Sequence, residues 1–247
     1  MNASQPAVLW RPTKQRAEGT ALAVFMERLR EDGKVGFARY EDLHKFSVDS
    51  PERFWPALID FAGLTAETWG DRVLVQGADM IAARWFPEAR LNYAENLLRR
   101  RGDGDALVFW GEDRVRRRLS WYELHSATAR LSQALLAAGV AAGDRVAGFM
   151  PNMPEAIVAM LAAASLGAVW SSCSPDFGTA AVLDRFGQIE PKVLFAADGY
   201  FYNGKTYDAL YSGYAADEGH LNNGAVVTHT RGKNELTHHW RLGLCIF

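Results

Sequence analysis

Apolar runs and helix-favouring segments alternate between residues 144 and 196. Residues 155–166 are rich in Ala, Leu and Met and contain no Gly or Pro, which favours a helix. Residues 179–189 are predicted to form a second helix, which ends before Pro191. Three short apolar runs flank these helices and are predicted to be strands: 145–150, 168–172 and 192–196. This alternation predicts right-handed crossovers and a buried parallel sheet.

Two loops follow predicted strands at positions where open α/β sheets bind ligands. They comprise residues 151–155, which begin Pro-Asn-Met-Pro, and residues 173–178, which contain Asp176. Ligands in such sheets sit outside the carboxyl ends of the parallel strands. Both loops are therefore candidate parts of a binding site.

The first hundred residues have a helical pattern. Leu22, Phe25, Met26 and Leu29 recur at the spacing of one face of an amphipathic helix. The sequence Ser50-Pro51-Glu52 predicts a further helix start, because Ser is a favourable N-cap and Pro fits the first helical position.

A hairpin and a long helix are predicted between this helical region and the sheet. Residues 106–110 and 115–119 flank Gly111-Glu112-Asp113, which indicates two antiparallel strands joined by a turn. Ser120 and Glu123 have the spacing of a capping box and open a helix that runs to about residue 138.

The composition is that of an ordinary globular protein. Apolar residues make up 49% of the 247 residues and charged residues 23%, which argues against disorder. The formal net charge of -2 gives no electrostatic reason to expect nucleic acid as a partner. The arginine runs 99–101 and 116–118 are interpreted as charges at a helix end and on the solvated face of a hairpin strand.

Cysteine content and hydropathy point to the cytoplasm. The two cysteines, Cys173 and Cys245, suggest a reducing compartment, and the N-terminus lacks the apolar core of a signal peptide. Residues 154–173 are apolar enough to raise the question of a membrane span, but Glu155 and Gly167 interrupt them. We expect a cytoplasmic protein with no membrane partner.

The composition changes after about residue 210. Residues 211–247 contain four of the six histidines, and their apolar positions show no clear amphipathic period. The histidine spacings match no familiar zinc site, so no metal ligand is assigned. We expect an irregular tail that is foreign to the preceding domain and packs poorly against it. Apolar surface left exposed there would favour self-association.

Several motifs resemble the adenylate-forming acyl-CoA synthetases. Residues 139–146 (GVAAGDRV), 150–155 (MPNMPE) and 161–169 (LAAASLGAV) resemble the first core motifs of that family. Residues 85–96 (WFPEARLNYAEN) resemble the segment ahead of this core in the acetyl-CoA synthetase branch. Two further segments are more similar to acetoacetyl-CoA synthetases: 172–178 (SCSPDFG) and 202–205 (YNGK). The resemblance covers roughly residues 8–210.

The resemblance implies a two-step ligase that uses ATP, Mg²⁺ and CoA. In that family a carboxylate attacks the α-phosphate of ATP, giving an acyl-adenylate and pyrophosphate, and the CoA thiol then displaces AMP. Mg²⁺ and a Ser/Thr/Gly-rich loop ending in Lys neutralise the phosphates. A mobile C-terminal domain supplies a catalytic Lys.

The 247 residues contain no such phosphate loop. Gly204-Lys205-Thr206 matches only the end of a Walker-type loop, and no helix pattern follows it. We therefore assign no catalytic residue and no metal ligand, and we expect none of ATP, Mg²⁺ and CoA to bind fully to this chain.

Lys205 and Asp176 are the candidate contacts for the nucleotide of CoA. In the family, the loop around Asp176 and the segment around Lys205 lie near this nucleotide. Lys205 would contribute a positive charge, whereas Asp176 is equally well suited to form a turn before Gly178. Cys173 lies at a strand end in an apolar run and is interpreted as a buried small hydrophobe rather than a nucleophile.

Pattern and resemblance together predict an α/β fold. It comprises a helical N-terminal region (1–100), the first parallel α/β units of an incomplete adenylate-forming large domain (101–210) and a tail (211–247). The expected function is that of an N-terminal fragment of a ligase that converts acetoacetate, ATP and CoA to acetoacetyl-CoA, AMP and pyrophosphate. One alternative is a non-catalytic binding or interaction domain that keeps the fold without the phosphate loop. Another is a small nucleotide-binding protein with a new tail, against which the missing loop argues.

Overall fold

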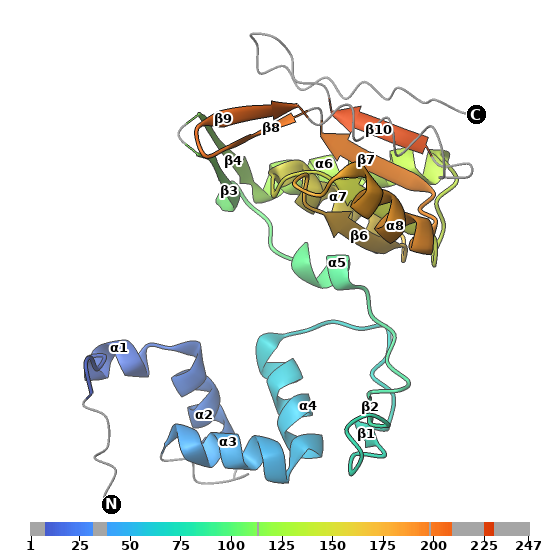
Figure 1. Ribbon diagram of the computed structural model, residues 1–247. Coiled ribbons are helices and arrows are strands. Elements are labelled where there is room, and N and C mark those ends of the chain that lie inside the picture. Colours follow the sequence, from blue (N-terminus) through green and yellow to red (C-terminus); the bar gives the residue numbers. More distant parts are fainter. Residues whose placement is uncertain (1–7, 32–38, 113, 198, 209–224, 230–247) are drawn as a thin grey trace, which may run out of the picture. The chain divides into compact units, whose positions relative to one another are not determined.

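The computed structural model describes residues 8–31, 39–112, 114–197, 199–208 and 225–229 (Figure 1). The chain divides into two compact units, Met1–Leu91 and Asn92–Phe247. Residues 92–100 thus belong to the second unit, whereas the sequence analysis placed them in the helical N-terminal region. Asn92 explains the difference, because its side-chain amide donates a 2.8 Å hydrogen bond to the backbone carbonyl of Ala164 in the second unit.

Helices dominate the first unit. They are α1 (Lys14–Glu18), α2 (Ala21–Glu31), α3 (Tyr40–Asp49) and α4 (Pro51–Ala62), followed by the antiparallel strands β1 (Leu74–Val75) and β2 (Arg84–Trp85). Phe25, Met26 and Leu29 are buried on the predicted face of α2, where they join Leu43 and Phe46 of α3 in one core cluster. The predicted start of α4 is confirmed with Pro51 at its first position, although the Ser50 side chain makes no capping hydrogen bond.

The second unit begins with a short helix, a hairpin and a long helix. These are α5 (Tyr93–Leu97), β3 (Asp105–Gly111), β4 (Val115–Ser120) and α6 (Trp121–Ala137). The predicted hairpin is confirmed, since β3 and β4 pair antiparallel. The predicted capping box is also present, with Ser120 Oγ accepting from the Glu123 N–H at 3.2 Å and the Glu123 carboxylate accepting from the Ser120 N–H at 2.7 Å.

A parallel sheet forms the centre of this unit. Its elements are β5 (Arg145–Phe149), α7 (Pro154–Ser165), β6 (Val169–Cys173), α8 (Thr179–Ile189) and β7 (Val193–Ala197). Strand β5 pairs parallel with β6 on one side and with β7 on the other. The predicted three-stranded parallel α/β unit is therefore confirmed. The chain goes from β5 to β6 on one side and then returns to β7 on the other side of β5, so the topological switch point lies between β5 and β7.

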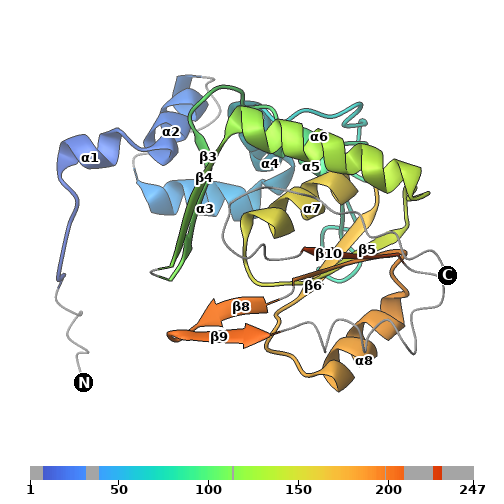
Figure 2. The ribbon, with the colours of Figure 1, turned by 90° about the horizontal axis from the view of Figure 1, so that it is seen from above.

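Helices cover both faces of the sheet. Figure 2 shows α6 and α7 over one face and α8 over the other. Val146, Val193 and Phe195 face α6 and α7 in one apolar cluster, whereas Phe149 and Leu194 face α8 in another. Near-continuous burial of β5 and β7 follows from this double cover, and it explains why these strands read as apolar runs rather than as alternating ones.

Strands beyond β7 differ from the sequence expectation. An antiparallel hairpin, β8 (Gly199–Tyr202) and β9 (Lys205–Asp208), follows the sheet. Within the segment 211–247, expected to be irregular, β10 (Ala225–His229) pairs parallel with β7 and gives the sheet order β10-β7-β5-β6. Five residues between turn-forming segments give too short a pattern for a strand prediction, and β10 is identified by its pairing with β7. The segment 211–247 was also predicted to pack poorly. Apart from β10, the residues that this prediction concerns lie outside those that the structure describes.

Candidate functional site

The hairpin β8–β9 carries the predicted contact Lys205. Asn203 and Gly204 form its two-residue loop, with φ of 51° and 73°, so both residues are in the left-handed region. A two-residue loop with this geometry is a type I′ turn, for which Asn-Gly is a preferred sequence. The turn sets Tyr202 directly opposite Lys205 and Tyr200 opposite Tyr207. The sequence segment that resembled the end of a phosphate loop is thus a hairpin turn.

One side of this hairpin is held by the β3–β4 turn. The Glu112 carboxylate accepts hydrogen bonds from the backbone N–H groups of Asn203 and Gly204, the latter at 3.0 Å. The Arg114 guanidinium donates to the carbonyl of Gly204 at 2.8 Å and to the Thr206 hydroxyl at 3.3 Å. These four contacts fix the position of the β8–β9 turn within the second unit.

The two faces of the hairpin have different surroundings. Phe201 and Thr206, which pair across the strands, lie on the face that meets Arg114, whose guanidinium carbon is 4.9 Å from the Phe201 ring centroid. The opposite face carries Lys205 and three tyrosines: Tyr200, Tyr202 and Tyr207. Tyr200 and Tyr207 stack with ring centroids 5.1 Å apart and an interplanar angle of 13°. We call these four residues the tyrosine face.

Asp176, the other predicted contact, meets the tyrosine face through Tyr200. It lies in the turn between β6 and α8 with an exposed side chain, and its carboxylate is close enough to the Tyr200 hydroxyl to influence the ionisation of that hydroxyl. Burial raises the pKa of the Tyr200 hydroxyl, and the negative charge of Asp176 raises it further. The structure therefore brings the Asp176 loop and the Lys205 hairpin together. Asp176 is both a turn residue, as one interpretation held, and a partner of this hairpin.

Cys173 ends β6, just before the Asp176 loop, and Arg185 belongs to α8, which follows that loop. Cys173 is buried beneath α8, and desolvation raises the pKa of its thiol even though the charge of Arg185 opposes that shift. The interpretation as a buried small hydrophobe agrees with this position. The Arg185 guanidinium carbon lies 4.2 Å from the Phe177 ring centroid, so a second cation borders the loop.

A separate cavity of about 570 Å³ lies between β4, α6 and the start of α7. Arg117 and Glu155 line it and form a 2.6 Å ion pair, with side chains only 18% and 6% exposed. The sequence analysis placed the run 116–118 on a solvated face. That interpretation holds for Arg116 and Arg118 but is wrong for Arg117, because alternation along β4 turns its side chain inward.

A fit to the implied ligands can be judged from these groups. The exposed ammonium of Lys205 and the exposed ring of Tyr202 have the chemistry that phosphates and bases of nucleotides require. Among the described residues, no group of three His, Cys, Asp or Glu side chains is arranged to hold a metal ion. None of the described helices is both long and apolar enough to cross a bilayer.

Arg114, Tyr200 and Tyr207 belong to this site but were not singled out from the sequence. Glu112 and Tyr202 lie in segments that the sequence analysis named, the predicted turn and the motif 202–205, but they were given no role of their own. The available signal was Asn203-Gly204 between two short aromatic segments, which is a strong local sign of a hairpin. The partnership of Glu112 with this turn bridges 91 residues and has no local sequence signal.

Two family models match this chain. Residues 94–237 match the family model for AMP-binding enzymes, and residues 40–97 match the acetyl-coenzyme A synthetase N-terminus. The first match includes much of the segment 211–247 that was expected to be foreign to the family. The second spans the boundary between the two compact units.

Similar full-length proteins are acetoacetyl-CoA synthetases. The chain is 52% identical to the one from Rhizobium meliloti (strain 1021), over 84% of this chain and 32% of that protein. It is 38% identical to the acetoacetyl-CoA synthetase of Danio rerio, over 82% of this chain and 30% of that protein. The solved acetoacetyl-CoA synthetase from Streptomyces lividans superposes with a TM-score of 0.84 at 40% identity, covering 93% of this chain and 36% of that one.

The chain thus spans about a third of the length of the relatives it matches. Its AMP-binding match covers more than half of its own residues, and the parallel sheet, both crossover helices and the preceding helical region agree with the sequence prediction. The chain belongs to the family of AMP-binding enzymes, and its relatives within that family are acetoacetyl-CoA synthetases.

Proposed function

We propose that this chain carries the N-terminal third of a cytoplasmic acid–CoA ligase. That ligase converts acetoacetate, ATP and CoA to acetoacetyl-CoA, AMP and pyrophosphate through an acyl-adenylate. The observation that carries the proposal is the 52% identity to an acetoacetyl-CoA synthetase over 84% of this chain. The acid and the cytoplasmic location rest on that relationship and on the low cysteine content.

The chemistry divides between these residues and the rest of such a ligase. A carboxylate is a poor acyl donor until one of its oxygens becomes part of a good leaving group, and adenylation with Mg²⁺-bound ATP achieves this. The 247 residues hold no phosphate loop for that step. Their contribution in this proposal is a part of the CoA site, where the Lys205 ammonium would bind a nucleotide phosphate and the Asp176 carboxylate would lie beside the same hairpin, near Tyr200.

A chimera tests the ligase directly. In this chimera, residues 1–208 of the present chain replace the matching third of the Rhizobium meliloti relative. The formation of acetoacetyl-CoA is measured through the amount of AMP released. We expect activity that requires acetoacetate, ATP and CoA together. In the same chimera, Lys205→Gln should raise the KM for CoA while leaving acetoacetate-dependent exchange of pyrophosphate into ATP unchanged. A folded chimera with no exchange for any short acid would instead favour the non-catalytic binding domain.

The chain on its own provides the complementary measurement. The purified 247 residues should show no acetoacetate-dependent exchange of pyrophosphate into ATP, because no loop neutralises the phosphates. Heat-sensitive, Mg²⁺-dependent exchange by this chain would show that the adenylation site has been misplaced.

A further inference from the structure

The cavity between β4, α6 and α7 has the size and the lining of a small-molecule binding site. Its volume of about 570 Å³ falls within the range of roughly 300–1,000 Å³ that is usual for such sites. Apolar side chains from all three elements form part of its wall, and they are Leu119, Ala127, Pro154 and Val158. A ligand in this cavity can therefore bury an apolar body.

Three arginines supply the positive charge of the cavity, Arg117 and Arg118 from β4 and Arg130 from α6. Arg117 is paired with a buried carboxylate, and Arg118 is paired with Asp105 at the surface. The Arg130 guanidinium donates a 2.9 Å hydrogen bond to the Ser126 hydroxyl, and it forms no ion pair with a carboxylate among the described residues. Its charge is therefore available to a ligand.

The two acidic residues of the wall are already engaged by protein groups. The Glu123 carboxylate accepts hydrogen bonds from the N–H and the hydroxyl of Ser120, at 2.7 and 3.0 Å. Glu155 pairs with Arg117. Such a buried pair is weak evidence of a stabilising role, because removing two charges from water can cost more than their attraction returns. It does hold the Arg117 guanidinium in a fixed orientation at the wall, which lowers the ordering cost of binding an anion there.

We propose that this cavity binds an organic acid with a bulky apolar body. The acid group lies at Arg130, where the planar guanidinium suits a carboxylate, and the apolar body lies against Leu119 and Val158. Three cations and two engaged carboxylates favour an anion over a cation, and the apolar wall favours an organic anion over inorganic phosphate. The cavity shares no lining residue with the β8–β9 hairpin, so this inference goes beyond the proposed function and does not depend on it.

The experiment uses the purified 247-residue chain, labelled with ¹⁵N, and 2-naphthoate as the probe. In an NMR titration, the amide shifts that change should cluster at residues that line the cavity, among them Leu119, Ala127 and Val158. The neutral alcohol 2-naphthalenemethanol has nearly the same shape and should bind about tenfold more weakly, because it lacks the charge that the arginines recognise.

Two variants test the role of the arginine charge. Arg130→Gln should weaken binding of 2-naphthoate about tenfold, because it removes a charged donor from the cavity. Arg116→Gln is the matched control, since Arg116 lies on β4 beside the Trp110 ring and does not line the cavity. It should bind the probe within about twofold of the parent chain. Both arginines are exposed, so neither change should disturb folding.

Three results would overturn the proposed acid site. They are equal affinity for the acid and the alcohol, equal weakening by Arg130→Gln and Arg116→Gln, and shift changes that are absent or cluster away from the cavity. The ligase proposal would stand after any of them, because the chimera decides it separately.

Discussion

The guanidinium of Arg117 lies 2.6 Å from a carboxylate oxygen of Glu155 and joins the middle of β4 to the first turn of α7. Both side chains are largely withdrawn from water, and Glu155 Oε2 has no hydrogen-bond partner among the described residues. A carboxylate in the first turn of a helix is favoured by the helix dipole. A buried pair of this kind makes the structure sensitive to loss of either member, because the remaining charge stays buried.

Arg117→Met should therefore destabilise the chain by about 3–5 kcal/mol, the usual result of leaving a buried charge unpaired. Arg118→Met is the matched control on the same strand, since its ion pair with Asp105 is exposed and should contribute less than about 1 kcal/mol. Chemical denaturation of both variants gives the comparison. Similar losses for the two arginines would contradict burial of the Arg117 pair, and Arg117→Met combined with Glu155→Gln should recover part of the stability.

The type I′ turn gives a second prediction. Gly204→Ala should destabilise the β8–β9 hairpin by about 1 kcal/mol, because a residue with a Cβ is strained at φ of 73°. Gly187→Ala is the control, because it should change stability in the opposite direction. Gly187 lies in α8 with open space where a Cβ would be added, so alanine should stabilise the chain by about 0.5–1 kcal/mol. Amide hydrogen exchange measures both effects locally. Unchanged exchange at the hairpin amides in Gly204→Ala would argue against this turn.

The pH dependence of stability should reveal Asp144. Its carboxylate accepts a 2.7 Å hydrogen bond from the Ala141 N–H and a 3.0 Å one from Lys192, and these contacts hold its pKa below the ordinary value. A depressed pKa contributes stability above the pKa of the unfolded chain, about 3.9, and that contribution is lost as the pH falls through the folded pKa.

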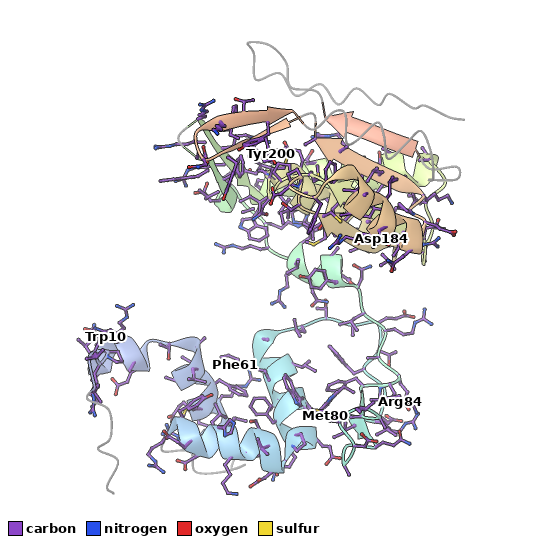
Figure 3. All side chains as sticks on the ribbon, viewed as in Figure 1. Trp10, Phe61, Met80, Arg84, Asp184 and Tyr200 are labelled. Carbon is purple, nitrogen blue, oxygen red and sulfur yellow. The ribbon has the colours of Figure 1, made fainter. Side chains whose placement is uncertain are left out.

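Asp144→Asn should accordingly be less stable than the parent chain at pH 7, and the difference should shrink as the pH falls below about 4. Asp184→Asn, on the outer side of α8 (Figure 3), controls for the same change in net charge. Denaturation midpoints measured from pH 7 to pH 2 provide the test. A difference between Asp144→Asn and the parent chain that stays constant over this range would show that the carboxylate is not stabilised in the folded state.

Ionisation of Tyr200 should respond to Asp176. Burial is the first cause of its raised pKa and the Asp176 charge is the second, so Asp176→Asn should lower that pKa while leaving it above the ordinary value of about 10. Ultraviolet titration of the parent chain, Asp176→Asn and Tyr200→Phe isolates the signal of this one hydroxyl. No shift between the parent chain and Asp176→Asn would remove the link between the two predicted site segments.

The sequence predicted the sheet well because its elements are separated by strong local signals. Gly167 and Pro191 bound the helices α7 and α8, and the apolar runs between them have strand length. Prediction failed where structure depends on distant partners. Strand β10 is recognised by its pairing with β7, and the buried position of Arg117 depends on its ion pair with Glu155. The Asn203-Gly204 turn had a local signal, which the sequence analysis did not use.

The contact between Glu112 and Asn203 also bears on the order in which the second unit assembles. These residues are 91 positions apart, and β5, β6, β7 and both crossover helices lie between them. Closing so long a loop costs entropy that only the completed intervening structure offsets, so contacts of this separation form late. During refolding, the amides of Asn203 and Gly204 should gain protection from exchange after those of β5 and β7, and earlier protection would contradict this order. The tyrosine face would then take its final position only in molecules whose sheet has already formed.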